Sequence, residues 1–325
     1  EDYDSIGAAV GIAHMAKMTG VSAHIVISKE SNAVMRLEKQ IADVPELQDL
    51  FISADTAEIL CNDQTLLFIV DTHRSDMTVA PKLLEKTTRR VVIDHHRRST
   101  DFIRQPLLTY METSSSSTSE LVTELLQYYS DTVELQKIEA TALYAGIVVD
   151  TKNFAVQTGV RTFDAAAYLR RSGADTQIVR ELFCTDLETI KMKSRLLSQT
   201  QILEDGVAIA VCPKDVKNAP IVAAQLADML INIDDVNTGF SFYELPDNII
   251  GISARSDGDV NVQLVMEALG GGGSRSSAAV QLHDVSVAQA VQMARKAIDE
   301  ARAQVAERLA ELDALESLFR SEERR

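Results

Sequence analysis

One stretch of the sequence joins an apolar run to an acid and two imidazoles. Residues 91–93 (Val-Val-Ile) lead directly into Asp94, His95 and His96, and Arg97 follows. This pattern predicts a buried strand that delivers polar side chains at its carboxyl end, where open α/β sheets place their ligands. Alone, the triplet is weak evidence for chemistry, because adjacent polar residues after a strand often form only a loop.

Acids at the borders of other apolar segments strengthen the case. The full set is Asp2, Asp4, Asp71, Asp94 and Asp150, and Asp71 and Asp150 share the same local sequence, Val-Asp-Thr. One such acid is usually a helix cap or a turn residue. Several converging carboxylates repel one another and raise each other's pKa unless cations neutralise them. Oxygen ligands with one or two imidazoles suit Mn²⁺ or Mg²⁺, and two such ions would support hydrolysis of a phosphoester.

The elements that must position these side chains alternate between strands and helices. We expect strands near residues 21–27, 66–70 and 91–94 with helices between them, which indicates a parallel α/β sheet. Consecutive helices over residues 161–203 lead to a second α/β region that begins at residue 207. We therefore predict a parallel-sheet domain and a smaller α/β domain joined by a helical connector. The expected boundaries are 1–185, 186–204, 205–300 and a C-terminal helical tail, 301–325.

Composition limits the classes of function. The 325 residues are 46% hydrophobic and 25% charged, with a net charge of −16. This charge argues against a nucleic-acid polymer as partner, because such binders carry broad basic faces. No apolar run approaches the roughly 20 residues that span a bilayer, so we expect no membrane contact by this segment. Three distant cysteines favour buried thiols in a reducing compartment. The sequence opens on Glu1 without a Met, and we expect a fragment of a longer protein.

The ordered motifs resemble those of the DHH phosphoesterase superfamily. Four segments carry the likeness: Asp2-Tyr3-Asp4, the Asp71 segment, Asp94-His95-His96 and the Asp150 segment. Residues 252–256 (Ile-Ser-Ala-Arg-Ser), followed by four glycines at 270–273, resemble the DHHA1 substrate domain of the same superfamily. Finer features are similar to the GdpP-type cyclic di-AMP phosphodiesterases, namely Arg97-Arg98, residues 116–126 and residues 144–152.

This resemblance implies roles for particular residues. It implies two divalent ions, with Mn²⁺ as the expected metal, and a metal-bridging hydroxide as the attacking species. The implied ligands are Asp2 for the first ion, Asp4 for the second, Asp71 as a bridge, and His95 and Asp150 at the second site. His96 and Asp94 are the candidate catalytic residues. His96 would donate a hydrogen bond to the scissile phosphate, and Asp94 would orient His95, as acids beside a ligating imidazole usually do.

The implied substrate contacts lie mostly in the second domain. They are Arg97 in the first domain and Ser253, Arg255, Gly271, Gly272, Gly273 and Ser274 in the second. Backbone N–H groups of a glycine run can approach a phosphate closely. Two departures from the family pattern stand out. The family's metal-binding His four residues before Asp2 lies outside this sequence, and Ser274 stands where the family has a phosphate-contacting His. A neighbouring Arg275 is a candidate to compensate.

We therefore expect a phosphodiesterase that opens cyclic di-AMP to linear pApA. Alternatives are an oligoribonuclease or pAp-type phosphatase of the same superfamily, or less favourably a pyrophosphatase. A different class is a catalytically weak, nucleotide-binding sensor module. The expected partner is cyclic di-AMP or a short adenine dinucleotide, and a homodimer is a further candidate. We expect a cytoplasmic location, with the parent protein membrane-anchored through segments outside this sequence.

Overall fold

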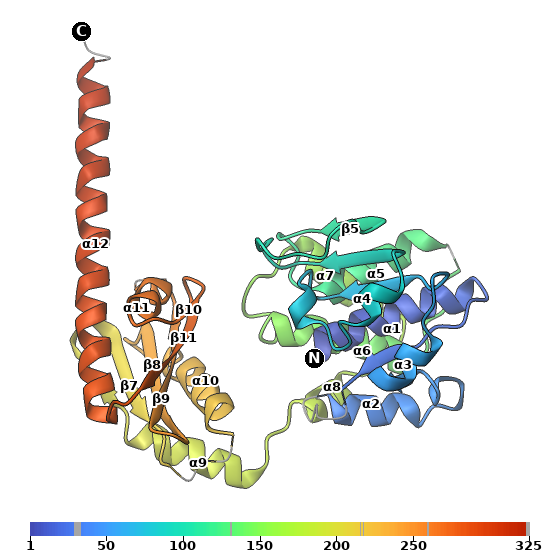
Figure 1. Ribbon diagram of the computed structural model, residues 1–325, viewed down its shortest axis with the longest axis horizontal. Helices are drawn as coiled ribbons and strands as arrows, with labels where there is room; N and C mark the ends of the chain where they lie inside the picture. The colour runs from blue at the N-terminus through green and yellow to red at the C-terminus, as the bar shows by residue number, and fades with distance from the viewer. Residues whose placement is uncertain (29–33, 131, 215, 217, 259, 323–325) are drawn as a thin grey trace. The chain divides into compact units, whose positions relative to one another are not determined.

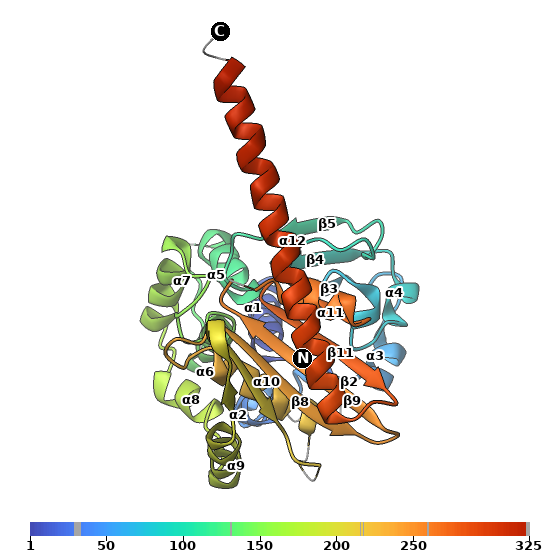
Figure 2. The same cartoon turned by 90° about the vertical axis from the view of Figure 1, so that its left-hand side faces the viewer.

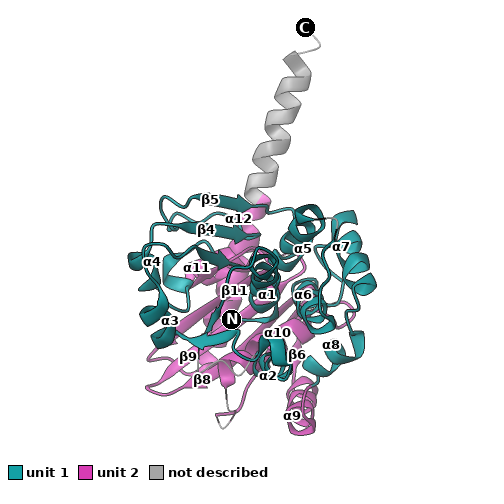
Figure 3. Cartoon of the chain, turned by 90° about the vertical axis from the view of Figure 1, so that its right-hand side faces the viewer, with its two compact units in different colours: residues 1–184 teal, residues 185–325 magenta. Residues whose placement is uncertain are grey.

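A computed structural model describes residues 1–28, 34–130, 132–214, 216, 218–258 and 260–322. The chain divides into two compact units, Glu1–Cys184 and Thr185–Arg325 (Figure 3). Both units mix helices and strands, and the sheets of the first are parallel, which confirms the predicted α/β class. The domain boundaries expected at residues 185/186, 204/205 and 300/301 stay predictions.

Unit 1 contains two small parallel sheets. In the first, β1 (Ile25–Ile27) pairs with β2 (Phe51–Ser53). In the second, the strand order is β3 (Leu67–Val70), β4 (Arg90–Asp94) and β5 (Leu108–Met111). The register aligns Val70 with Ile93, so the residues that follow β3 and β4 emerge at the same edge. This edge is where the side chains of residues 71 and 94–96 meet.

Helices cover both faces of the three-stranded sheet. Val91 and Ile93 point to a core shared with α1, α5, α6 and α7, whereas Val92 and Ile69 pack with Ile103 and α4 on the other face (Figure 1). The helices and 3₁₀ turns of unit 1 are α1 (Tyr3–Met18), α2 (Met35–Ala42), η1 (Pro45–Leu47), α3 (Ala54–Leu60), η2 (Ser75–Met77), α4 (Leu83–Lys86), α5 (Thr118–Tyr129), α6 (Lys137–Asp150), α7 (Val160–Arg171) and α8 (Thr176–Leu182).

The two Val-Asp-Thr segments of the sequence lie in different secondary structure, because the one that contains Asp150 lies at the end of helix α6. The apolar run before Asp150 belongs to a helix that is buried on most sides, including Leu143 and Ile147. A short apolar run does not distinguish a buried helix from a buried strand. Asp71 therefore follows a strand, while Asp150 ends a helix, although both occur in Val-Asp-Thr.

Glycines allow α1 and α6 to pack closely. A Cβ atom on Gly7 would lie 2.6 Å from the backbone oxygen of Ala142. A Cβ on Gly146 would overlap Ser119 Oγ and lie 2.9 Å from Asp4 Oδ1. The helices run antiparallel, so the first turn of α1 lies beside the last turns of α6. This packing brings Asp4 next to the end of α6.

Unit 2 is built on a mixed six-stranded sheet with the order β10-β11-β9-β8-β7-β6. Strands β7 and β8 are parallel and the other neighbours are antiparallel. The strands are β6 (Gln201–Ile202), β7 (Val207–Val211), β8 (Thr238–Leu245), β9 (Ile249–Ser256), β10 (Gly272–Gly273) and β11 (Ser277–His283). The glycine run thus includes a short strand paired with β11.

Helices sandwich this sheet. Phe240 and Ile252 face a core formed with α11 and α12, and Ala208 and Tyr243 face α10 and α9 on the other side (Figure 2). The helices and 3₁₀ turn of unit 2 are α9 (Leu187–Ser198), η3 (Glu204–Gly206), α10 (Ala219–Leu230), α11 (Val262–Ala268) and α12 (Val287–Glu322).

The long helix α12 agrees with the helical tail expected from sequence. Its side chains from 307 onward, which include the predicted apolar positions Leu312, Leu315 and Phe319, lie outside the described residues, as does the chain from 323 to 325. Among the residues that the structure describes, none of the helices combines the length and the apolar character that crossing a bilayer requires.

Candidate metal centre

Four of the side chains singled out by sequence converge in unit 1. Ligand atoms of Asp4, Asp71, His95 and Asp150 all lie within 4.8 Å of one another, and we name this set the acid–histidine cluster. Its members come from the first turn of α1, the end of β3, the end of β4 and the last residue of α6. Residues far apart in sequence are therefore brought to one edge of the parallel sheet.

Asp4 is the most deeply buried acid of the cluster. Its side-chain oxygens accept hydrogen bonds from the backbone N–H groups of Thr118 at 2.7 Å and Ser119 at 2.8 Å. Burial and the neighbouring charge of Asp150 raise the pKa of Asp4 to about 6, although the bonds from Ser119 oppose this shift. The N-terminus of α5 therefore supplies the positive end of a helix dipole to a buried carboxyl group.

Asp71 has an unusual backbone conformation directly after β3. Its φ is +62°, in the left-handed region that residues other than glycine seldom adopt. Burial and the charges of Asp4 and Asp2 raise its pKa to about 10. The Thr118 hydroxyl donates a hydrogen bond to Asp71 Oδ1 at 3.1 Å. Strained backbone is found mostly at functional sites, where surrounding contacts hold it in place.

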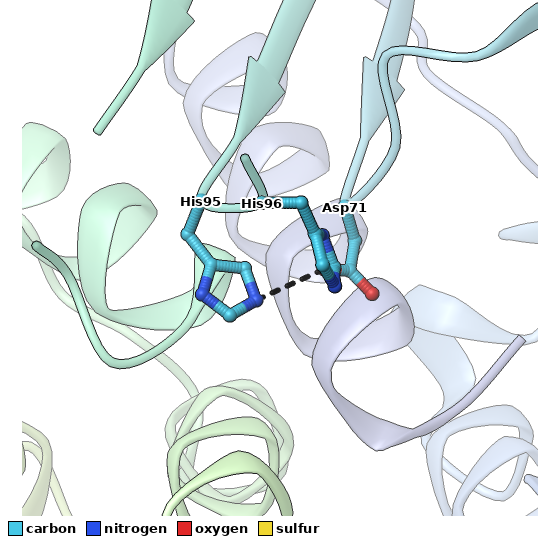
Figure 4. Close-up of side chains that lie close together, drawn as sticks. All are labelled: Asp71, His95 and His96. Carbon is cyan, nitrogen blue, oxygen red and sulfur yellow. Dashed lines mark ion pairs between the residues drawn. The ribbon is translucent and has the colours of Figure 1, made fainter. Parts of the chain in front are cut away.

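His95 presents one ring nitrogen to the acids. Its Nδ1 lies 3.4 Å from the backbone oxygen of Ser115, a long contact in which the ring can only donate. Its Nε2 lies 3.0 Å from Asp150 Oδ2 and 3.7 Å from Asp71 Oδ1 (Figure 4), yet this buried atom has no hydrogen-bond partner of acceptable geometry. Burial acts to lower the pKa of His95, but Asp150 and Asp4 outweigh it and raise that pKa.

The cluster has the properties of a divalent-metal site. Burial and repulsion by neighbouring carboxylates raise the pKa of Asp4 and of Asp71, and a cation would remove that repulsion. The orphaned Nε2 of His95 is a lone-pair donor in need of a partner, and a carbonyl on the other ring nitrogen is the usual support of a ligating imidazole. Three carboxylates and one imidazole suit Mn²⁺, Mg²⁺ or a related ion.

Among the described contacts, the side chain of Asp94 bonds to His96 and His73, and its expected role of orienting His95 stays a prediction. Its Oδ1 accepts hydrogen bonds from the backbone N–H and Nδ1 of His96, at 3.1 and 2.8 Å, and its Oδ2 lies 2.5 Å from Nδ1 of His73. Successive residues of an extended chain point to opposite sides, so Asp94 and His96 share one side and His95 takes the other. Burial acts to raise the pKa of Asp94, but the bonds from His96 and His73 lower it to about 2.

His96 lies at the exposed side of the site. Its side chain is 55% exposed, and Nδ1 lies 3.8 Å from Asp71 Oδ1. Asp71, His95 and His96 form a second group whose ligand atoms could hold an ion (Figure 4). Since Nδ1 donates to Asp94, Nε2 is the ring atom of His96 left for a substrate, and it can donate a hydrogen bond only in the imidazolium form.

Like Asp94 and His96, the expected residues Asp2 and Arg97 lie outside the acid–histidine cluster in the described structure. Asp2 is the N-cap of α1, and its Oδ1 accepts hydrogen bonds from the backbone N–H groups of Asp4 and Ser5 at 3.0 Å each. Its charge nevertheless contributes to the raised pKa of Asp71, which indicates that it is near. Arg97 is exposed on the loop after His96. The roles of Asp2 as a ligand and Arg97 as a substrate contact stay predictions.

The expected substrate residues of unit 2 lie on adjacent strands. Ser253 and Arg255 are on β9, where they pair with Ala279 and Ser277 of β11. Arg255 is not isolated, because its Nε lies 3.3 Å from Asp228 Oδ1. The glycines precede or form β10, and Gly271 is tightly enclosed by the backbone of β11.

Ser274 closes the β10–β11 turn. Its backbone N–H donates to the Ser277 oxygen at 2.7 Å, and its Oγ accepts the Ser277 N–H at 3.2 Å. The side chain therefore has a structural role in the hairpin. Arg275 donates to the backbone oxygen of Gly258 at 3.2 Å and remains exposed.

Comparison with known proteins identifies the family to which this chain belongs. The model of the DHH family N-terminal domain matches residues 1–147, and the model of the DHHA1 domain matches residues 204–307. The chain belongs to the DHH family. The DHH match covers Asp4, Asp71 and His95 of the cluster, and the DHHA1 match covers the strands that carry Ser253, Arg255 and the glycine run.

Curated relatives of this DHH chain include two bacterial proteins. One is the cyclic-di-AMP phosphodiesterase PdeA of Listeria monocytogenes serotype 1/2a (strain 10403S), 44% identical over 92% of this chain and 46% of that protein. The other is the cyclic-di-AMP phosphodiesterase GdpP of Bacillus subtilis (strain 168), also 44% identical over 92% of this chain and 46% of that protein. The chain thus spans about half the length of the curated relatives it matches.

A solved structure shares the fold. It is an exopolyphosphatase-related protein from Bacteroides fragilis, with a TM-score of 0.77, 20% sequence identity, and coverage of 94% of this chain and 91% of that one. This likeness shows a common fold and carries no inference about substrate.

Sequence reasoning missed two contributors to the DHH site. His73 was given no role, yet it is buried against Asp94. The serine-rich turn, residues 115–119, overlaps the stretch 116–126 that carries part of the family likeness, but the sequence indicated no contact with the site, and its backbone and hydroxyl groups contact three members of the cluster. The sequence offered one signal for the turn, which is an unusually long run of hydroxyl residues before a helix.

Proposed function

We propose that this chain is a metal-dependent phosphodiesterase that hydrolyses cyclic di-AMP to linear pApA. The observation that carries the proposal is the 44% identity with cyclic-di-AMP phosphodiesterases over 92% of the chain, together with a cluster of acids and one imidazole in unit 1. A buried set of mutually repelling carboxylates suits two divalent ions, and Mn²⁺ is the ion we propose.

In this proposal Asp4, Asp71, His95 and Asp150 hold the ions, with Asp2 as a further ligand of the first. The ions would lower the pKa of a bound water toward neutrality and would offset negative charge on a phosphoryl oxygen. The protein's own part is orientation. Asp94 fixes His96 through Nδ1, so that Nε2 is directed to donate a hydrogen bond to the phosphate. No side-chain nucleophile is required.

The roles proposed for unit 2 concern substrate binding. Ser253, Arg255, Gly271, Gly272, Gly273 and Ser274 are proposed to contact the nucleotide, together with Arg97 of unit 1. Backbone N–H groups of a glycine-rich hairpin and an arginine are suitable donors for a phosphate. Arg255 is already paired with Asp228, which would orient its guanidinium group.

The test is a hydrolysis assay with Mn²⁺ on cyclic di-AMP, pApA, pAp and pyrophosphate, with products separated by chromatography. We expect cyclic di-AMP to be opened with the highest kcat/KM and Asp71→Asn to abolish turnover. Asp76→Asn is the matched control, because Asp76 is an exposed acid nearby that pairs only with Arg74 among the described contacts. Preferred turnover of pApA or pAp would favour an oligoribonuclease or pAp-type phosphatase instead.

A second candidate, a catalytically weak sensor of the nucleotide, is favoured by Ser274. Its hydroxyl group belongs to the turn of the hairpin, and a serine cannot offer the positive charge that an imidazole can. Binding of cyclic di-AMP without turnover, measured by calorimetry in the presence of Mn²⁺, would support the sensor. Turnover of any of the four substrates at the rate expected of an enzyme would reject it.

A homodimer and a cytoplasmic location stay predictions. Light scattering of the purified chain over a range of concentrations tests the first, since a dimer would double the mass. Fractionation of cells that express the parent protein tests the second.

A further inference from the structure

The serine-rich turn consists of five consecutive hydroxyl residues, all of them buried: Ser115, Ser116, Ser117, Thr118 and Ser119. Burying polar groups is unfavourable unless each finds a hydrogen-bond partner. The hydrogen-bond partners of these five residues therefore indicate why polar side chains are buried in this turn.

Its outward contacts go to the acid–histidine cluster. The backbone N–H groups of Thr118 and Ser119 donate to the two side-chain oxygens of Asp4. The Thr118 hydroxyl donates to Asp71 Oδ1 at 3.1 Å, and the Ser115 backbone oxygen lies 3.4 Å from His95 Nδ1. One five-residue segment thus contacts three of the four members of the cluster.

Its inward contacts make the turn rigid. Ser117 is the N-cap of α5 and its Oγ accepts the Glu120 N–H at 3.0 Å, while Ser115 Oγ donates to the Ser117 oxygen at 3.0 Å. Ser116 bonds to the side chain of Glu120 through both its N–H and its hydroxyl group. A segment braced in this way can hold other side chains in fixed orientations.

We propose that the serine-rich turn is a positioning element for the metal ligands and that Thr118 is the positioning residue for Asp71. Asp71 needs one, because its backbone lies in the left-handed region and its carboxyl group is repelled by Asp4 and Asp2. The Thr118 hydroxyl group occupies one lone pair of Oδ1 and so fixes the orientation of the carboxyl group. This inference rests on the proposed metal centre.

The experiment measures Mn²⁺ affinity by calorimetry, without substrate. Thr118→Val removes the hydroxyl group at nearly constant volume, and Thr118→Ser keeps it. We expect Thr118→Val to weaken Mn²⁺ binding by about 10- to 100-fold, the usual effect of losing a group that supports a ligand, and Thr118→Ser to bind within about threefold of wild type. The metal-free melting temperature of each variant is measured alongside.

Thr123→Val is the matched control. Thr123 lies on the same helix, is equally buried, and donates to the Ser119 backbone oxygen at 2.7 Å. It contacts none of the cluster in the described structure, so its variant should bind Mn²⁺ as wild type does. Equal losses in Thr118→Val and Thr123→Val would mean a general effect on packing and would overturn the inference, as would wild-type affinity in Thr118→Val.

Two further arms keep the test decisive. If Thr118→Val does not fold, Thr118→Ala replaces it, because a smaller side chain avoids a clash where a methyl group takes the place of the hydroxyl. The comparison of Ala with Ser at position 118 then decides the outcome in the same way. If the wild-type chain does not bind Mn²⁺, the proposed metal centre itself is rejected. If the wild type binds and the Thr118 variant binds equally well, only the positioning role of Thr118 is rejected.

Discussion

His73 Nδ1 lies 2.5 Å from Asp94 Oδ2, and both side chains are buried. The backbone N–H of Ser99 donates to the other ring nitrogen, Nε2, at 2.8 Å, so that atom carries no proton. The ring proton is therefore on Nδ1 and is donated to Asp94, which also accepts from His96. His73 therefore supports His96 indirectly, because both side chains bond to the carboxyl group of Asp94. The backbone oxygen of His73 also accepts the Ile103 N–H, which fixes the loop that carries Arg97.

Removing His73 should destabilise the protein. We expect His73→Ala to lower the free energy of unfolding by about 1.5–3 kcal/mol, the usual cost of losing a hydrogen bond to a charged group. Urea unfolding followed by circular dichroism measures it. His24→Ala is the control, because His24 is exposed and bonds only to the backbone oxygen of Asp49 among the described contacts. Similar effects of the two substitutions would contradict a special role for His73.

The metal-free protein should lose stability as the pH rises. Burial and the charges of Asp4 and Asp2 raise the pKa of Asp71 to about 10, whereas an unfolded Asp titrates near about 4. Between those values the folded chain keeps a proton that the unfolded chain has released, so stability falls with increasing pH. The melting temperature in the presence of a chelator should therefore decrease from pH 6 to pH 9.

Two comparisons test this pH dependence. Asp71→Asn has no titrating group at this position, so its melting temperature should change less over the same range. Adding Mn²⁺ should restore more stability at pH 9 than at pH 6, because the ion competes with the proton. A flat or rising melting temperature of the metal-free wild type would show that Asp71 is ionised in the folded protein.

Gly146 should not tolerate a side chain. A Cβ atom there would overlap Ser119 Oγ and approach Asp4 Oδ1 to 2.9 Å. We expect Gly146→Ala to destabilise the fold by about 1–3 kcal/mol, as overpacking does, and to weaken Mn²⁺ binding by displacing Asp4. Gly159→Ala is the control, since a Cβ at Gly159 meets no atom within 4 Å. Calorimetric titration of both variants measures affinity, and wild-type affinity in Gly146→Ala would refute the predicted displacement.

Ser274→His should improve substrate binding if phosphate contacts limit it. A charged donor makes a hydrogen bond roughly twice as strong as a neutral one, so we expect KM for cyclic di-AMP to fall by roughly five- to tenfold. Ser276→His is the control, because it places an imidazole two residues along the same exposed turn. Steady-state kinetics measure both. Little or no gain in kcat/KM for Ser274→His would mean that the hairpin is not impaired by its serine.

The sequence predicted the chemistry of the cluster better than the elements that carry it. Acids and histidines at the ends of apolar runs marked Asp4, Asp71, His95 and Asp150 as candidates alongside Asp2, Asp94 and His96, and the family resemblance implied which of them are ligands. The same letters could not show that Asp150 ends a helix, because periodicity in a short apolar run is ambiguous. Strands β5 and β11 were missed because exposed residues interrupt them, two of the four in β5 and three of the seven in β11, so neither is a continuous apolar run.

The contacts of Asp94 were beyond sequence patterns. Its partnership with His73 depends on the register that aligns β3 with β4, which places residue 73 beside the end of the neighbouring strand. The serine-rich turn likewise acquires its role only when α5 packs against α1. In both cases the deciding information is which side of a strand or helix faces which neighbour, and that is set by tertiary packing.

The close packing of α1 along α6 also has a consequence for the order of folding. The acid–histidine cluster joins residue 4 to residue 150, so it exists only after a long loop of unit 1 has closed. Closing such a loop costs chain entropy, and contacts of this kind slow folding. During synthesis, Asp4 stays without the other members of the cluster until α6 has been made. Metal uptake would therefore follow the docking of α6 on α1 and could not begin the folding of unit 1.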